Sequence, residues 1–363
     1  MTGAREKHRA IRKTTGQRRR TTLSDIARQA GIHVTTVSQI LNRRSNCWAS
    51  EATRRHVMKL AGELGYRPNL AARSLRSGRS HVIGYISPGF GTGSPNSRAM
   101  GLTDTAMQHD YTVIVSSHPN DSESEDRLIR RLADRSMDGL VIYPADKGPH
   151  TELRRLVNDG FPVVTLDGSA LLDFECDDIS PDYQQVGRLQ VRHLLETGRR
   201  RIGLIDTIPT GRINVIRDQA IRDLLAREGL PPPLELQIAI EDLQSEFVDA
   251  EPLVTGIRAC LETQRGCFDA LISHDTLASL AARILMETGC RIPGDVSVMG
   301  AGNSILAIYG LLPLTSISTA DDQAGALAFG LLMDRMKQKR ANLPFRRIVS
   351  PSNLIVRSST IRT

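Results

Sequence analysis

The chain has 363 residues, enough for two or three domains, and its 40% hydrophobic and 24% charged residues are typical of a soluble globular protein. It contains no apolar run of 18 residues and no signal-peptide pattern, so we expect a cytoplasmic protein without a membrane span. Its five cysteines are odd in number and show neither a CxxC pair nor zinc spacing, which argues against a disulfide framework, and nothing in the sequence indicates a metal site or a cofactor.

Charge is divided unevenly along the chain, whose net charge is +7. Residues 1–80 contain 18 Lys and Arg against 4 Asp and Glu, a net charge of +14. Residues 81–363 contain 29 against 36, a net charge of −7. A basic end on a mildly acidic body is typical of a protein that binds nucleic acid through that end. We expect residues 1–20, which lack apolar periodicity, to be a disordered basic tail.

Residues 21–67 are predicted to form a helix-turn-helix domain. A capping box in the stretch TLSD predicts a helix that starts near Leu23 and ends at Gly31. Apolar residues at helical spacing predict a second helix over 34–41, and a third helix is expected over 51–64. Two short helices joined by a tight glycine turn and supported by a third form a helix-turn-helix unit.

The second predicted helix is the part of this unit that enters the DNA major groove. Val34 and Thr35 lead it, and they offer a methyl surface to thymine and a hydroxyl to a base edge. Gln39 lies one turn further along and can pair with adenine. A solvated polar face is the alternative, but the capped helix before it and the charge division favour DNA reading. The phosphates are expected to be bound by Thr36, Ser38 and Asn42.

Residues 68–80 are predicted to be a linker that contains a short hinge helix. Leu75 stands among arginines there and is poorly explained as a core residue. It suits a wedge inserted between base pairs in the minor groove, with Arg73 and Arg76 on the phosphates. An exposed linker is the alternative when no DNA is bound.

A resemblance to the LacI/GalR family of bacterial transcriptional regulators rests on TTLSDIARQAGIHVTTVSQILN, on SEATRRHVMKLAGELGYRPNLAARSLRSGRSHVIGYI and on the later LIVRSST. It implies a homodimer on a palindromic operator, base-reading positions at Val34, Thr35 and Gln39, and an intercalating Leu75. Two positions depart from the family. The family usually has Arg at Gln39, so the preferred bases differ, and Ser at His33, which predicts a less well capped recognition helix.

From residue 81 the chain alternates short apolar runs with amphipathic segments, which predicts an α/β body with parallel sheets. The expected strands are HVIGYIS, YTVIVSS, MDGLVIYP, FPVVTLD, RRIGLID, LELQIAI, FDALISH, VSVMGAG and LTSIST. The pattern restarts near CDDISPD, residues 176–182, which predicts two similar lobes over 81–363. The resemblance implies a periplasmic-binding-protein-like architecture, with three chain crossings between the lobes and an effector in the cleft.

Ligands of α/β sheets bind outside the carboxyl ends of the strands, and this rule selects candidate effector-binding residues. They stand at or after the ends of expected strands and are Ser87, Asp167, His274, Asp275 and Asn303. Arg217 is added because it aligns with the effector-binding arginine of the family. A surface ion pair is the alternative for Arg217, and a helix cap for Asp167 and Asp275.

Two effector motifs of the family are absent. Neither the glycine nor the aromatic residue that usually follows the arginine is found after Arg217, and Gly302 stands where the family has a sugar-binding aspartate. An arginine without a nearby acid favours an anionic ligand. We therefore expect a small-molecule effector, a sugar or a sugar acid, and the sugar acid is the hypothesis to test.

Two other classes of protein remain open. The first is a DNA-binding regulator or architectural protein without a small-molecule effector. The second is a nucleotide-dependent α/β enzyme, suggested by the glycines of SPGFGTGS, but this stretch lacks the spacing of the dinucleotide and phosphate-loop fingerprints. No catalytic constellation is recognisable, so we expect no enzyme activity. The expected partners are double-stranded operator DNA, the effector and a second copy of the chain. When bound to DNA, the protein is expected at the nucleoid.

Overall fold

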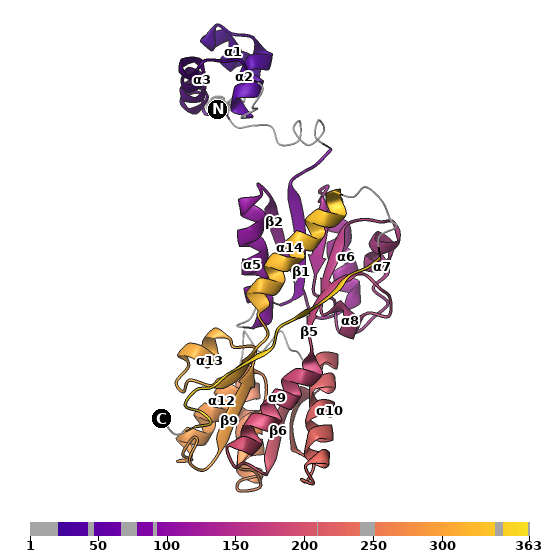
Figure 1. Cartoon of the computed structure of the whole chain (residues 1–363), viewed down its shortest axis with the longest axis vertical. Coiled ribbons are helices and arrows are strands. Elements are labelled where there is room, and N and C mark those ends of the chain that lie inside the picture. Colours follow the sequence, from indigo (N-terminus) through magenta and orange to yellow (C-terminus); the bar gives the residue numbers. More distant parts are fainter. Residues whose placement is uncertain are drawn as a thin grey trace, which may run out of the picture. The chain divides into compact units, whose positions relative to one another are not determined.

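The structure, a computed structural model, describes residues 21–42, 47–66, 78–89, 93–208, 210–239, 251–337 and 344–361. The chain divides into two compact units, residues 1–78 and residues 79–363, called here the head and the body (Figure 1).

Three helices form the described part of the head: α1 (Leu23–Ala30), α2 (Val34–Leu41) and α3 (Glu51–Glu63). The predicted capping box is confirmed, because the Thr22 hydroxyl accepts from the Asp25 amide and the Asp25 carboxylate accepts from the Thr22 amide. Gly31 ends α1 with φ 66°, in the left-handed region that favours glycine. The helices enclose a small core of Ile26, Ala27, Val37, Ile40, Cys47, Val57, Leu60 and Ala61.

Within the described residues the body contains two six-stranded sheets. The first, in the order β11-β5-β4-β3-β1-β2, is parallel and consists of β1 (Val82–Pro88), β2 (Thr112–His118), β3 (Gly139–Ile142), β4 (Val163–Leu166), β5 (Asp177–Pro181) and β11 (Arg347–Ser350). The second, in the order β12-β10-β9-β8-β6-β7, consists of β6 (Ile202–Ile208), β7 (Leu234–Ala239), β8 (Ala270–Ile272), β9 (Ser297–Ala301), β10 (Thr315–Ser318) and the antiparallel β12 (Asn353–Ile355).

Each sheet is covered by its own helices, and each sheet with its helices forms one lobe. The first lobe has α5 (Ser94–Gln108), α6 (Ser122–Ala133), α7 (Thr151–Asn158), α8 (Gly168–Leu171) and α14 (Asp321–Lys337). The second lobe has α9 (Tyr183–Glu196), α10 (Arg212–Arg227), α11 (Glu251–Thr263), α12 (Asp275–Glu287) and α13 (Ile305–Tyr309). The predicted fold class, a helical head and a two-lobed α/β body, is confirmed.

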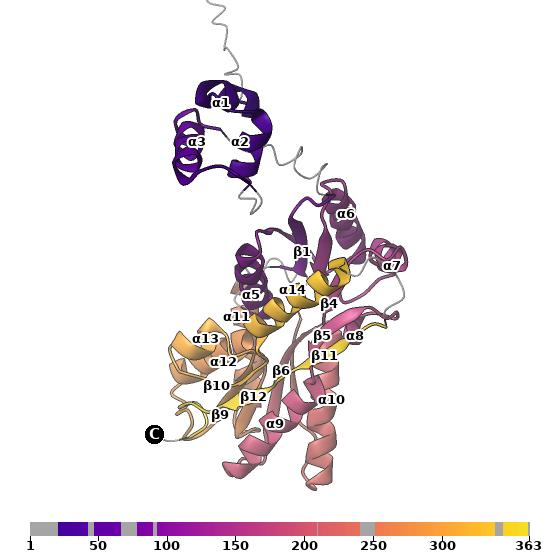
Figure 2. The same ribbon diagram turned by 45° about the horizontal axis from the view of Figure 1, so that its top comes forward.

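The chain crosses between the lobes three times, as the resemblance implies. It passes from β5 into α9, from β10 into α14, and from β11 into β12. Figure 2 shows the last of these crossings in yellow, where the C-terminal strands join the edges of the two sheets. Three connections hold the lobes together while leaving a cleft between them.

All nine expected strand runs contain a strand, but three strands escaped the sequence analysis: β5, β11 and β12. The segment 176–182, at which the pattern was expected to restart, contains β5, which belongs to the first sheet. The second lobe begins only with α9. The five residues of β5 are all buried although two are aspartates, so the strand lacks the apolar pattern that reveals its neighbours.

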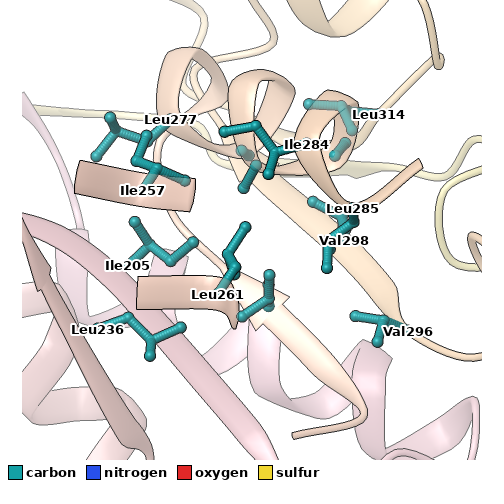
Figure 3. Packing of buried hydrophobic residues seen from close by; sticks show 14 of the residues in the cluster. Ile205, Leu236, Ile257, Leu261, Leu277, Ile284, Leu285, Val296, Val298 and Leu314 are labelled. Carbon is teal, nitrogen blue, oxygen red and sulfur yellow. The ribbon is translucent and has the colours of Figure 1, made fainter. Parts of the chain in front are cut away.

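The second lobe has an apolar core formed where α11 and α12 cover the sheet. Figure 3 shows Ile257 and Leu261 of α11 facing the strand residue Ile205. On the other side, Ile284 of α12 and Val298 of β9 contribute to the same cluster. Burial of such side chains stabilises the fold by about 1.5–3 kcal/mol each. Polar residues that follow the carboxyl ends of β8 and β9 lie instead at the cleft.

Candidate DNA-reading helix and ligand cavity

The N-terminus of α2 is capped by His33. This residue has an extended backbone, with φ −66° and ψ 143°, and its Nδ1 accepts from the Thr35 amide at 3.4 Å. The same Nδ1 lies 2.8 Å from the Thr35 hydroxyl oxygen. The imidazole thus takes the place of the serine that the family usually has there, but its capping bond to the helix backbone is long.

The residues expected to read DNA lie on the outer face of α2, to different extents. Thr35 and Asn42 are exposed, whereas Val34 is half-buried and packs against the head core. The Asn42 amide donates to the Ser38 carbonyl at 2.7 Å and lies 3.3 Å from its hydroxyl, so these two side chains are tied to the helix end. Three other residues of the set are also half-buried: Thr36, Ser38 and Gln39. The expected minor-groove residues Arg73, Leu75 and Arg76 lie outside the described residues.

A cavity of about 240 Å³ lies between the lobes, at the carboxyl ends of β3, β4, β8 and β9. This is below the roughly 300–1,000 Å³ of sites for drug-sized molecules, and it suits a small ligand. Its lining brings together four of the expected effector-binding residues, Asp167, Arg217, His274 and Asp275. It does not include the other two: Ser87 is buried within β1, and the side chain of Asn303 accepts from Arg357 at 2.6 Å.

Arg98 of α5 lines this cavity and was not among the expected residues. It is 2% exposed, and its Nη1 lies 2.5 Å from an Asp167 oxygen. Its Nε donates to Asp321 at 2.8 Å. Asp167 makes no capping bond to α8, so the helix-cap alternative fails for this residue. A signal was present in the sequence, because Arg98 precedes Leu102 and Ala106 at intervals of four residues on the buried face of one helix.

Arg217 is buried, which excludes the surface ion pair considered for it. Its Nε donates to Asp218 at 2.9 Å, and its Nη2 lies 3.7 Å from Asp206. The premise that this arginine has no nearby acid is therefore wrong. Adjacent residues on a helix usually point in different directions, so Asp218 was not expected to be its partner. Asp206 comes from β6, and only the fold brings it near.

Asp275 faces the cavity from the first turn of α12, and it supports the loop after β9. Its carboxylate accepts from the Ser304 amide at 2.6 Å and from the Ser316 hydroxyl at 2.7 Å. Gly300 makes room for it, since a Cβ there would lie 2.0 Å from one of its oxygens. Gly302 has φ 115° and also lines the cavity. Asp275 thus holds the loop that contains Gly302, the residue that stands where the family has a sugar-binding aspartate.

Two buried charged groups line the cavity, one from each lobe. Oδ1 of Asp167, in the first lobe, lacks a hydrogen-bond partner among the described residues, whereas Nη2 of Arg217, in the second, lies 2.8 Å from Oδ1 of Asp218 but without the geometry of a hydrogen bond. A buried acceptor or donor without a partner costs about 1–3 kcal/mol. A ligand that donates to the aspartate and accepts from the arginine removes this cost and connects the two lobes.

A hollow of about 320 Å³, larger than the cleft cavity, lies in the second lobe beside α11 and α12. Its floor is apolar and includes Leu261, Phe268 and Ile284. Its charged residues are exposed, as Arg201 and Arg265 show. The cleft cavity is the better candidate site, because its polar groups are buried and come from both lobes.

Burial governs ionisation in the cavity. It raises the pKa of Asp167, an effect that Arg98 opposes, and it raises the pKa of Asp275. Burial, together with the charge of Arg217, lowers the pKa of His274 to about 4. His274 is therefore neutral near pH 7 and offers the cavity a hydrogen-bonding group without charge.

We expect His274 to reduce the stability of the body as the pH falls from about 6.5 to 4. In this window the unfolded chain takes up a proton that the folded His274 does not, so the free energy of unfolding decreases, by roughly 3 kcal/mol at most. The raised pKa values of Asp167 and Asp275 act in the opposite direction. Urea unfolding of the native chain and of His274→Gln at pH 7.5, 6 and 5 should show a shallower decline for the variant. Equal declines would contradict the assignment.

None of the helices in the described ranges combines the length and the apolar character needed to cross a lipid bilayer. Over the same ranges, no group of three or more His, Cys, Asp or Glu is arranged to hold a metal ion. The five cysteines are free thiols.

Comparisons with known proteins match both parts of the chain. A family model for bacterial regulatory proteins of the lacI family matches residues 22–69, and one for a periplasmic binding protein-like domain matches residues 191–360. The HTH-type transcriptional repressor PurR of Edwardsiella ictaluri (strain 93-146) is 29% identical over 326 residues, which cover 88% of this chain and 91% of that protein.

Two solved structures share the fold. The Lac repressor dimer bound to operator and the anti-inducer ONPF has a TM-score of 0.76 and 22% identity, and the match covers 94% of this chain and all of that one (100%). A LacI family transcriptional regulator from Enterococcus faecium with bound ribose has a TM-score of 0.65 and 22% identity, and the match covers 77% of this chain and 98% of that one.

A helix-turn-helix head joined to a two-lobed, periplasmic-binding-protein-like body defines a class of DNA-binding transcriptional regulators. The matches to both parts of the chain confirm the resemblance to the LacI family of bacterial regulatory proteins that was seen in the sequence. The match to the lacI-family model lies in the head, and the match to the periplasmic-binding-protein-like model lies in the body. The relatives are regulators rather than enzymes.

Proposed function

We propose that the protein represses transcription by binding a palindromic operator as a homodimer, under the control of a small-molecule effector in the cleft cavity. The observation that carries the effector is a pair of buried charged groups that line one cavity from two lobes: the Asp167 carboxylate, whose Oδ1 has no hydrogen-bond partner among the described residues, and the Arg217 guanidinium. A ligand that bonds to both favours one arrangement of the lobes over another. Such a difference in affinity between two states is what regulates DNA binding.

The effector is an uncharged sugar rather than a sugar acid. Each cavity arginine already faces two carboxylates, Arg98 those of Asp167 and Asp321, and Arg217 those of Asp206 and Asp218. An added anion would meet more negative than positive charge, whereas hydroxyl groups can donate to carboxylates and accept from guanidinium. The Enterococcus faecium regulator, which has the same fold, is a protein with bound ribose.

The DNA-binding half of the proposal rests on the outer face of α2 and on the linker. Val34, Thr35 and Gln39 read bases in the major groove, and Thr36, Ser38 and Asn42 bind phosphates. The linker residues Arg73, Leu75 and Arg76 act in the minor groove. Operator DNA as the partner places the protein in the cytoplasm.

Exposed apolar side chains lie on two helices of the body, α13 and α5. Ile305 and Tyr309 of α13 are 60% and 80% exposed, and Leu311 just beyond the helix is 79% exposed. Met100 and Met107 of α5 are 66% and 69% exposed. We infer that these side chains contact a second copy of the chain. The Lac repressor of the same fold is a dimer on its operator, which supports this arrangement.

A ligand panel tests the effector. We expect one or more neutral sugars, at about 100 times the dissociation constant, to stabilise the body by about 2.7 kcal/mol, which raises the melting temperature by roughly 5–10 °C. The corresponding sugar acids should have little effect. Thermal denaturation of the full chain gives the ligand, and binding to operator DNA with and without it gives the direction of control.

The variant Arg217→Met is the matched control, because it removes the donor that the ligand needs. It should abolish the shift caused by the active sugar. A sugar acid that stabilises the body while neutral sugars do not would overturn the proposed ligand class. A protein that no member of a broad panel stabilises, but that still binds its operator, would be a regulator without a small-molecule effector.

A further inference from the structure

The hydroxyl of Thr35, which leads the DNA-reading face, is already engaged within the protein. Its oxygen lies 2.8 Å from His33 Nδ1, a distance typical of a strong hydrogen bond. The Thr35 amide points to the same nitrogen, but at 3.4 Å. The shorter of the two contacts is to the hydroxyl, so the imidazole interacts mainly with the side chain of Thr35 and only weakly with the helix backbone.

The direction of this hydrogen bond follows from the chemistry of the ring. Nδ1 accepts from the Thr35 amide, so in the neutral imidazole the proton is on Nε2 and Nδ1 is an acceptor. The Thr35 hydroxyl must then be the donor in the 2.8 Å contact. A hydroxyl that has donated its hydrogen keeps two lone pairs and can only accept from a further partner.

Bases in the major groove differ in the partner that they offer to such an oxygen. Adenine and cytosine present exocyclic amines, which donate. Guanine and thymine present O6, N7 or O4, which accept. An oxygen limited to accepting therefore discriminates between the two pairs of bases, whereas a free threonine hydroxyl rotates to suit either.

We infer that His33 is a positioning residue for base recognition. By accepting a hydrogen bond from the Thr35 hydroxyl, it makes the recognition helix prefer adenine or cytosine at the contacted base. This inference rests on the proposed function, in which Thr35 reads a base edge. The helix itself does not depend on the imidazole. The His33 carbonyl accepts from the Thr36 and Val37 amides at 3.0 Å and 3.2 Å, and these backbone bonds remain when the side chain is replaced.

Selection from a pool of randomised duplexes tests this with the full chain. The position read by Thr35 is the one at which Thr35→Ala changes the selected base. There the native chain should prefer adenine or cytosine, and His33→Ala should weaken that preference roughly fivefold. His33→Asn should restore it, because the Asn amide oxygen replaces Nδ1, whereas His33→Gln, whose oxygen lies further out, should not. Adding His33→Ala to Thr35→Ala should change nothing more.

The outcomes separate this inference from the proposed function. A native chain that selects no sequence contradicts DNA reading itself. A native chain with a defined operator whose base preference is unchanged in His33→Ala contradicts the role of His33. So does a uniform loss of affinity for all sequences in that variant, which would mean that the imidazole only caps the helix or contacts a phosphate. Circular dichroism of each variant confirms that the head is folded.

Discussion

We expect the substitution Gly325→Ala to destabilise the body by about 3 kcal/mol or more. Gly325 lies in α14 where this helix packs against α5, and a Cβ there would lie 2.0 Å from the Arg98 carbonyl oxygen. Gly101 makes the reciprocal approach, since its Cβ would lie 1.9 Å from the Asp322 carbonyl oxygen. In both cases the obstacle is backbone, so the helices must separate. Urea unfolding followed by circular dichroism measures the loss.

A second glycine of α14 provides the matched control. Gly330 is exposed, and nothing lies within 4 Å of a Cβ built on it. Because alanine is favoured over glycine within a helix, Gly330→Ala should stabilise the body by about 0.5–1 kcal/mol. Two glycine-to-alanine substitutions on one helix should thus change the free energy of unfolding in opposite directions. If both were stabilising, the close approach of α5 and α14 would not be required by the fold.

We expect Arg98→Ala to cost about 3–5 kcal/mol and to abolish effector binding, because it leaves two buried aspartates without their cation. Asp167 and Asp321 are 1% and 5% exposed. Thermal denaturation measures the loss of stability, and the sugar panel measures the loss of binding. Arg98 also holds together three segments, α5, the end of β4 and the start of α14.

A triple variant separates the charge of Arg98 from its bulk. Neutralising both acids in Arg98→Met, Asp167→Asn, Asp321→Asn should recover much of the stability lost in Arg98→Ala. The exposed pair of Arg127 with Glu123 is the control, and Arg127→Ala should cost less than about 1 kcal/mol. An Arg98→Ala variant as stable as Arg127→Ala would show that the aspartates do not need their partner.

The fold followed from the sequence wherever local chemistry decides it. The bounds of α1 and α2 could be predicted because a capping box, a left-handed glycine and helical apolar spacing all lie within one short stretch. The apolar runs of the body predicted nine strands, because each run also lies within one short stretch of sequence. In β5 the sequence shows aspartates instead, and they are buried because partners elsewhere in the chain satisfy them, such as Arg335 for Asp177.

The cavity was predicted in part. The strand-end rule placed Asp167, His274 and Asp275 correctly at one site, because parallel strands bring their carboxyl ends to one edge. It failed for Asn303, whose side chain is held by Arg357, 54 residues away in the chain. It also missed Arg98 and the acids around Arg217, since ion pairs between distant segments leave no pattern in the sequence.

The last crossing between the lobes bears on how the chain is made. The strands β11 and β12 come late in the sequence, yet each completes the edge of a different sheet, beside β5 and β10. The edges at β5 and β10 therefore stay uncovered during synthesis until the residues of β11 and β12 have left the ribosome. The described helices of the head pack on one another around their own core, so the head can fold while translation of the body continues.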